Sequence, residues 1–234
     1  MDSNSKLPMT QNIEIPREVP FMTLSDAVLF PQAIMPLFIF EPRYKKMLSD
    51  ILPLDRVFAI ATLDESKTGT VEKEMCHPVA GVGIIRACKK NPDGNLNLIL
   101  QGIARVKFES IINQAPYRKA RVKPIISKPG GTDQQIASMR KQLTHLIQTQ
   151  CRFGADIPKE ILLFLSNVED PESMLDLSIY TLCNSTALKL ELLQTGSVLS
   201  RFEKFALHLE TEIRKLKLNI KLKGNLDDGN IGSN

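Results

Sequence analysis

The chain has 234 residues, of which 43% are hydrophobic and 24% are charged, and its formal net charge is +4. These values are ordinary for a folded globular protein and argue against general disorder and against a fibrous repeat. Its apolar runs are shorter than the roughly 18 to 20 residues that cross a bilayer, and its first residues lack a signal-peptide pattern. We therefore expect a cytoplasmic protein that makes no contact with membranes.

The first half of the chain, up to about residue 127, has the pattern of β-strands. Short runs rich in Val, Ile, Leu and Phe are separated by Pro, Gly, Asn and Asp, as in a sheet with tight connections. The predicted strands are residues 19–24, 35–40, 57–62, 79–89, 95–111 and 117–126.

Glycines in this half predict a turn and several bends. The sequence N-P-D-G at 91–94 predicts a turn between two antiparallel strands, because Gly94 can adopt a positive φ. Gly102 lies inside the following strand, and Gly81 and Gly83 lie inside the preceding one. Glycines at such positions favour bulges that curl a sheet. We therefore expect a strongly curved, barrel-like sheet.

One helix interrupts the predicted strands. Pro42 fits the first helical position, and Pro53 ends the pattern. Between them, apolar side chains recur at helical spacing: Tyr44, Met47, Leu48, Ile51 and Leu52. This apolar face should plug or flank the barrel.

The second half of the chain is predicted to be helical. The sequence K-P-G-G-T at 128–132 marks the change from period two to period 3.6. Beyond it, Asp170 and Ser185 are suitable helix caps, and the longest helix has an apolar face from Phe202 to Ile220. We expect four segments: a disordered amino terminus (1–14), a β-barrel subdomain (15–128), an α-helical bundle (132–223) and a disordered tail (224–234).

The sequence carries none of the familiar motifs of an enzyme. It has no phosphate-binding G-x-x-x-x-G-K-[ST] loop, no G-x-S-x-G sequence and no H-E-x-x-H pair. Its histidines and cysteines are scattered, without ligand spacing: His77, His145, His208, Cys76, Cys88, Cys151 and Cys183. We therefore expect no catalytic residues, no cofactor and no metal ion; an enzyme of unfamiliar type stays open as an alternative.

The richest local signal is the sequence LFPQAIMPLFIFEPRY at 29–44. It holds three prolines, three phenylalanines and two charged residues around one strand and one helix start. Proline makes the path rigid, and aromatic side chains offer contact area at low entropic cost. One interpretation is a tightly packed corner of the core. The other is a binding site, because Glu41 and Arg43 would need partners if they were buried.

Positive charge gathers on the last predicted helix. Between Arg201 and Lys223 there are seven Lys or Arg residues and three Glu residues. Such a stripe is typical of the solvated face of an amphipathic helix. It could also contact the phosphates of nucleic acid, and this reading stays open.

Three stretches, in order along the chain, resemble the amino-terminal substrate-binding domain of Lon proteases. They are VPFMTLSDAVLFPQAIMPLFIFEPRYKKML, VAGVGIIRACKKNPDGNLNLILQGIARVKF and PYRKARVKPI. The resemblance spans about residues 15–223, and it implies an α+β fold in which a PUA-like β pseudobarrel precedes an α-helical bundle with a long C-terminal helix. Gln32 departs from the family, which commonly has Gly there, so the local turn needs another explanation.

The resemblance also implies a function. It suggests a non-enzymatic module that binds unfolded or tagged polypeptides, as an adaptor or regulator of proteolysis, in a stand-alone form without the Walker A motif or Ser-Lys dyad of full-length Lon. The candidate peptide contacts are Phe38, Phe40, Glu41, Arg43 and Tyr44. Expected partners are protein substrates and, as an open alternative, a separate ATP-dependent protease.

Two further interactions stay open at this stage. A PUA-like fold with a basic C-terminal helix could bind RNA or another nucleic acid, although stacking aromatics interleaved with basic residues are not evident. The long helix could also form a weak homo-oligomer, because an apolar face can pair with a second copy of itself.

Overall fold

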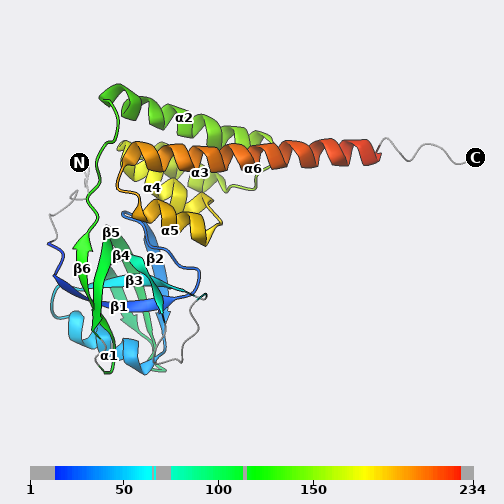
Figure 1. Cartoon of the computed structure of the whole chain (residues 1–234). Helices are drawn as coiled ribbons and strands as arrows, with labels where there is room; N and C mark the ends of the chain where they lie inside the picture. The colour runs from blue at the N-terminus through cyan, green and yellow to red at the C-terminus, as the bar shows by residue number, and fades with distance from the viewer. Residues whose placement is uncertain (1–13, 65, 67–74, 113–114, 228–234) are drawn as a thin grey trace, which may run out of the picture. The chain divides into compact units, whose positions relative to one another are not determined.

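The computed structural model describes residues 14–64, 66, 75–112 and 115–227 and, within them, an α+β fold (Figure 1). It divides into two compact units. The strand unit comprises the residues up to Ser25 together with Ile34–Pro124, and the helical unit comprises Asp26–Ala33 together with the chain from Ile125 onward. Residues 26–33 thus belong to the helical unit, although they lie within the range 15–128 that the sequence assigns to the strands. The expected disordered amino terminus lies, apart from Glu14, outside the described residues.

The strand unit contains six strands within its described residues, and each corresponds to a predicted one. They are β1 (Glu18–Leu24), β2 (Ile34–Ile39), β3 (Val57–Leu63), β4 (Cys76–Lys90), β5 (Leu96–Ile112) and β6 (Lys119–Pro124). The predicted hairpin is confirmed, because β4 and β5 pair antiparallel and Gly94 has a φ of 79° in the connecting turn.

The strand pairings close on themselves. The order along the sheet is β2-β5-β4-β3-β1-β6, and β6 pairs with β5 as well as with β1. β5, β4, β3, β1 and β6 therefore form a ring of pairings, and β2 is attached to the outside of this ring through β5. The register between β4 and β5 shifts between Val82 and Gly83, where Gly102 lies opposite, as the glycine pattern predicts.

The core of the strand unit is built by the ring strands. Alternate side chains from all of them form one buried cluster: Val19, Phe21, Val57, Ala59, Ala61, Cys76, Ala80, Val82, Val106, Phe108, Ala120 and Val122. The rings of Phe21 and Phe108 lie 5.0 Å apart between centroids. Because successive side chains of a strand point to opposite faces, one face of each strand fills this core and the other faces outward.

Helix α1 (Pro42–Ile51) crosses one end of the strands (Figure 1). Pro42 occupies its first turn as predicted, and its buried face is Tyr44, Met47, Leu48 and Ile51. Two hydroxyl groups connect it to the sheet: Tyr44 Oη accepts a hydrogen bond from the backbone N–H of Thr23 (3.3 Å), and Tyr117 Oη donates one to Asp50 (3.0 Å). One of these bonds thus anchors α1 to β1, and the other anchors it to the segment before β6.

The helical unit contains α2 (Asp133–Arg152), α3 (Lys159–Ser166), α4 (Pro171–Leu182), α5 (Thr186–Gln194) and α6 (Val198–Asp227). The predicted caps are confirmed: Asp170 accepts from the N–H of Ser173 at 2.8 Å, and Ser185 accepts from the N–H of Leu188 at 3.2 Å. Such caps satisfy backbone donors that have no partner inside the helix.

The apolar face of α6 packs over a shorter stretch than the sequence pattern indicates. Phe205, Leu209 and Ile213 are buried, whereas Ile220 is exposed. α2 ends at Arg152, and α6 extends beyond it (Figure 1), so the distal turns have no helix alongside them in the described part of this unit. α6 also continues to Asp227, into the range 224–234 that was expected to be disordered; residues 228–234 lie outside the described residues.

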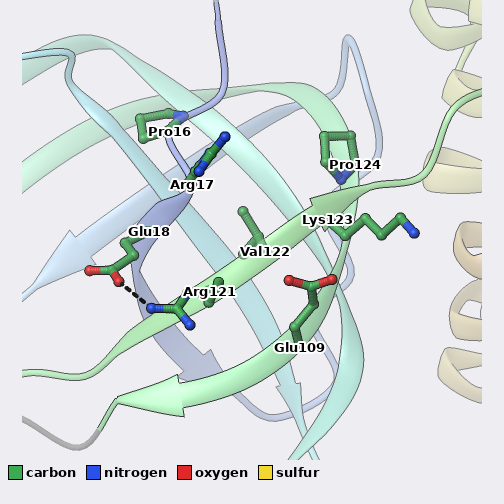
Figure 2. Close-up of a pocket in the computed structure, with 8 residues that line it drawn as sticks. All are labelled: Pro16, Arg17, Glu18, Glu109, Arg121, Val122, Lys123 and Pro124. Atoms are coloured by element: carbon green, nitrogen blue, oxygen red, sulfur yellow. Dashed lines mark hydrogen bonds and ion pairs between the residues drawn. The ribbon is translucent and has the colours of Figure 1, made fainter.

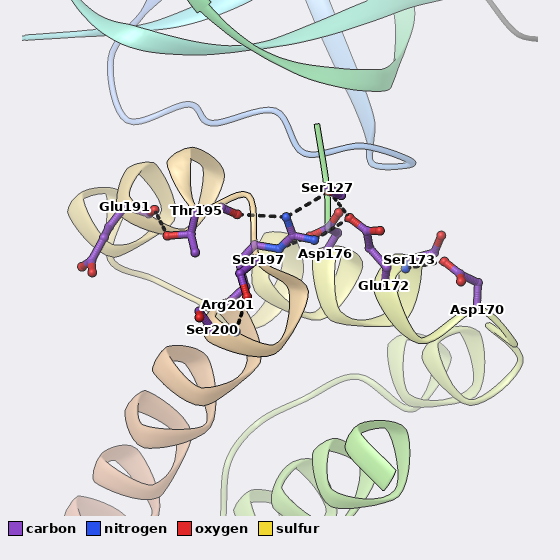
Figure 3. A network of polar contacts seen from close by, with 10 residues as sticks. All are labelled: Ser127, Asp170, Glu172, Ser173, Asp176, Glu191, Thr195, Ser197, Ser200 and Arg201. Carbon is purple, nitrogen blue, oxygen red and sulfur yellow. Dashed lines mark hydrogen bonds and ion pairs between the residues drawn. The ribbon is translucent and has the colours of Figure 1, made fainter. Parts of the chain in front are cut away.

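The prediction that the basic residues of α6 form a solvated stripe is wrong for Arg201, which is buried. Its side chain is 0% exposed and lies 2.5 Å from Glu172 and 3.6 Å from Asp176 of α4 (Figure 3). Its guanidinium also donates to the carbonyl of Thr195 (3.0 Å) and to the hydroxyl of Ser127 (3.3 Å). A buried cation requires such partners because leaving water is costly. The charge pattern alone could not distinguish this residue from the exposed lysines of the same helix.

The backbone around Gln32 explains how the chain forms its turn with Gln at a position where the family commonly has Gly. Ala33 N–H donates to the carbonyl of Phe30 (3.2 Å), and Gln32 has a φ of 64°. With Pro31 at the second position and a positive φ at the third, this is a type II turn. Gln32 therefore adopts the left-handed conformation that glycine adopts more easily.

Replacing Gln32 with glycine should stabilise the protein slightly. The left-handed conformation costs a non-glycine residue about 1–2 kcal/mol, and the greater freedom of glycine in the unfolded chain cancels about 0.4–1 kcal/mol of that gain. We expect urea unfolding to show a rise of about 0.5 kcal/mol for Gln32→Gly and a loss for Gln32→Val, whose branched side chain tolerates this conformation poorly. A glycine variant that is less stable than the parent would contradict this account.

Candidate functional site

A row of apolar side chains is exposed along β2. Ile34, Phe38 and Phe40 are 48%, 54% and 60% exposed, and they alternate with the buried Met35 and Ile39. The Phe38 and Phe40 rings lie 6.3 Å apart between centroids. Contiguous apolar groups on a surface are costly in water, so this row is a candidate contact surface for another molecule.

The position of β2 explains why this row is exposed. β2 lies outside the ring of pairings, and among the described strands it pairs with β5. Its inward residues cover the sheet, and its outward residues face solvent. Pro36 lies in the middle of the strand and lacks a backbone N–H, which suits an outer strand and discourages a further strand from pairing with it.

A groove of about 420 Å³ runs beside this row. β2, β5 and β4 contribute to it, and the residues that line it are Pro36, Leu37, Phe38, Ala87, Cys88, Lys89, Asn97, Leu98 and Ile99. The strand register aligns them in rows across one face: Pro36 with Ile99 and Ala87, and Phe38 with Asn97 and Lys89. The groove is thus an apolar surface with a lysine at its β4 side.

The other predicted contacts lie at the start of α1. Glu41 and Arg43 are partly exposed and form an ion pair, with Arg43 Nε 2.8 Å from Glu41 Oε2. The Arg43 guanidinium also lies 4.6 Å from the centroid of the Tyr44 ring. Tyr44 itself is buried, 4% exposed, with its hydroxyl bonded to Thr23. Phe38 and Phe40 therefore lie near each other at the surface, Glu41 and Arg43 form a separate pair, and Tyr44 is buried next to Arg43.

A larger cleft, of about 900 Å³, lies elsewhere in the strand unit (Figure 2). Its lining from β1, β5, β6 and the segment before β1 includes the charged residues Arg17, Glu18, Glu109, Arg121 and Lys123. Arg121 and Glu18 pair at 3.2 Å and face each other, while Lys123 extends away from them (Figure 2). Exposed, mutually compensating charges of this kind have little cost in water. We therefore regard the apolar groove, though smaller, as the candidate site.

Several basic residues of α6 form ion pairs or cation–π contacts within the helical unit. Lys204 pairs with Glu191 at 2.6 Å, and Lys215 pairs with Glu212 at 2.7 Å. The ammonium group of Lys217 lies 4.7 Å from the centroid of the Phe153 ring. Together with the burial of Arg201, these contacts reduce the positive charge that α6 could offer to phosphates.

The described residues show no group of three or more His, Cys, Asp or Glu side chains that could hold a metal ion. Nor do they include a helix that is both long and apolar enough to cross a membrane. Burial raises the pKa of the Cys88 thiol at the groove, which disfavours the reactive thiolate. The groove itself offers apolar contact surface and the ammonium group of Lys89.

The sequence singled out Phe38, which lines the groove, and Phe40, which is exposed next to it, but it gave no sign of the residues that β4 and β5 contribute. Ala87, Lys89 and Ile99 come from a hairpin some 50 residues further along the chain. The only available signal was the N-P-D-G turn, which fixes the pairing of β4 with β5. Which residues of β5 face β2 depends on a register that no local pattern specifies.

The described residues thus form an α+β fold that carries an exposed apolar groove on its strand unit. The family model of the ATP-dependent protease La (LON) substrate-binding domain matches residues 18–211, and the chain belongs to this family.

Among curated proteins, the chain is 26% identical over 219 residues to a Lon protease of Desulfosudis oleivorans, covering 92% of this chain and 26% of that protein. It is 25% identical over 215 residues to a Lon protease of Dictyoglomus thermophilum, covering 92% of this chain and 27% of that protein. The chain therefore spans about a quarter of the length of these relatives.

Solved structures with the same fold include two amino-terminal domains. The Lon N-terminal domain protein from Xanthomonas campestris matches with a TM-score of 0.59 at 18% identity, covering 80% of this chain and 96% of that one. The N-terminal domain of the Mycobacterium avium complex Lon protease matches with a TM-score of 0.60 at 16% identity, covering 84% of this chain and 98% of that one.

Proposed function

We propose that this domain binds apolar segments of unfolded or degradation-tagged polypeptides in the groove beside β2. The observation that carries the proposal is the exposed row of Ile34, Phe38 and Phe40 next to that groove. Membership of a substrate-binding family supports it. The closed ring of strand pairings likewise supports a PUA-like pseudobarrel as the scaffold that holds the groove rigid.

The physical basis is the burial of apolar surface on binding. Each Å² of apolar area removed from water stabilises a complex by about 25 cal/mol before the costs of association. An unfolded chain exposes its apolar side chains, whereas a folded protein hides them, so the groove discriminates by what is accessible. Because the main contacts are apolar, binding should depend only weakly on salt.

The predicted contacts have different roles in this proposal. Phe38 and Phe40 touch the client directly. Glu41 and Arg43 form a paired charge at the edge of the site and contact polar parts of the client. Tyr44 supports them from below, through the cation–π contact with Arg43 and the hydrogen bond from Thr23.

Membership of the LON substrate-binding family supports a part in proteolysis. We propose that it acts without catalytic chemistry of its own, as an adaptor or regulator that presents clients to an ATP-dependent protease, either a separate one or one to which it is joined. Nucleic-acid binding is the competing proposal, and the paired and buried basic residues of α6 weigh against it.

Fluorescence anisotropy with a labelled protein, kept unfolded by carboxymethylation of its cysteines, tests this proposal. The double variant Phe38→Ser/Phe40→Ser should bind at least about tenfold more weakly, because two aromatic contacts together exceed about 1.4 kcal/mol. Its free energy of unfolding should change by less than about 0.5 kcal/mol per site, since both side chains are exposed.

The matched control removes two exposed apolar residues of the helical unit, in Leu163→Ser/Phe164→Ser of α3. This variant should bind like the parent. Equal binding by all three proteins, or equal losses in both variants, would refute the assignment of the groove. Salt-sensitive binding of a labelled RNA without binding of the unfolded protein would instead establish the competing proposal.

A further inference from the structure

The two sides of the groove differ in chemical character: one is apolar and the other carries a basic residue. Along β2 it is apolar, with Ile34, Pro36 and Phe38 facing outward. Along β4 it is lined by Ala87, Cys88 and Lys89, and Arg86 lies just outside this lining. β5 lies between the two sides and separates them by two strand spacings, or roughly 10 Å.

The register places both basic residues beside the apolar row. Lys89 is paired with Asn97, which in turn is paired with Phe38. Arg86 lies at an irregularity of the β4–β5 register, and its Nε donates to Gln101 Oε1 at 2.6 Å. Gln101 is the partner of Ile34 on β2. Lys89 therefore lies across β5 from Phe38, and Arg86 lies across β5 from Ile34.

No acidic residue is among the residues that line the groove. The acidic residues of the adjoining turn and helix start are already engaged. Asp93 accepts hydrogen bonds from the N–H (2.9 Å) and the Nδ2 (2.7 Å) of Asn95, and Glu41 pairs with Arg43. Within the lining of the groove, no acidic residue therefore compensates the charge of Lys89.

We propose that the groove selects apolar segments that also carry acidic residues. This inference rests on the proposed function and adds the chemistry of the client. An extended segment lying over β5 points successive side chains to opposite sides. Apolar side chains at alternate positions contact β2, and Asp or Glu side chains between them face Arg86 and Lys89. Complementary charge across an interface fixes register and excludes like-charged partners.

Three labelled peptides of one length, with the same alternating apolar residues, test this selection. Their intervening positions carry Asp, Ser or Lys, and anisotropy is measured at low salt. The parent domain should bind the Asp peptide about threefold to tenfold more tightly than the Lys peptide, as expected for one or two exposed ion pairs. Raising the salt to about 0.5 M should shrink this preference, because exposed charges are screened.

Lys89→Glu and Lys90→Glu form a matched pair of variants. Both residues are exposed neighbours on β4, but only Lys89 lines the groove. Lys89→Glu should abolish or reverse the preference for the Asp peptide, and Lys90→Glu, with the same change in net charge, should keep it. Equal effects of the two variants would overturn the assignment to this side of the groove.

The peptide series separates the two proposals. If the parent binds all three peptides equally well, apolar recognition stands and the selection for acidic residues is refuted. If it binds none of them and the unfolded protein does not bind either, the proposed function itself fails. If it prefers the Lys peptide, the charge assignment is wrong although the groove is used.

Discussion

Replacing Arg201 with alanine should lower the free energy of unfolding by about 3–5 kcal/mol, the usual cost of removing one partner from a buried ion pair. The Arg201 and Asp176 side chains are 0% and 2% exposed, so the variant would leave a carboxylate buried without its cation. It would also remove the donors to the Thr195 carbonyl and the Ser127 hydroxyl. These contacts join the segment before α2, helix α4 and the start of α6 within the helical unit (Figure 3).

Urea unfolding followed by circular dichroism measures this loss. The control is Arg214→Ala on the same helix, where the arginine is exposed and donates to Thr211 at 3.1 Å. It should change stability by less than about 0.5 kcal/mol. A loss below about 1 kcal/mol for Arg201→Ala would mean that the buried pair contributes no more than a surface pair does.

Alanine substitutions at two phenylalanines of the sequence at 29–44 should have different effects: one should lower stability, and the other should weaken binding. Phe30 is fully buried and belongs to the helical unit, whereas Phe38 is exposed on β2 of the strand unit. Phe30→Ala should cost about 3–5 kcal/mol, because a buried aromatic side chain leaves both lost burial and a cavity. Phe38→Ala should cost less than about 0.5 kcal/mol and should instead weaken client binding.

Hydrogen exchange shows where the loss occurs. In Phe30→Ala, exchange should rise more in α4, α5 and α6 than in β3, β4 and β5, because residues 26–33 pack with the helices. A uniform rise, or a rise confined to the strands, would contradict the assignment of this segment to the helical unit. Phe38→Ala should leave the exchange of both units unchanged.

The elements themselves could be predicted from the sequence, because their signals are local. Period-two runs, Gly94 in its turn and the glycines of β4 and β5 specify the strands and their bends. Pro42, Asp170 and Ser185 mark helix starts through the rigid φ of proline and through side chains that accept backbone N–H groups. Phe38 and Phe40 also stood out locally, through the density of proline and aromatic residues around them.

Only the tertiary structure decided how these elements meet. The pairing of β6 with both β1 and β5, and the register that brings Lys89 and Ile99 beside Phe38, depend on contacts between distant parts of the chain. The same holds for Arg201, which the sequence counts as one more surface cation and which the fold buries against α4. The physical reason is that periodicity records which side of an element is apolar, whereas burial and charge pairing depend on what the other elements place there.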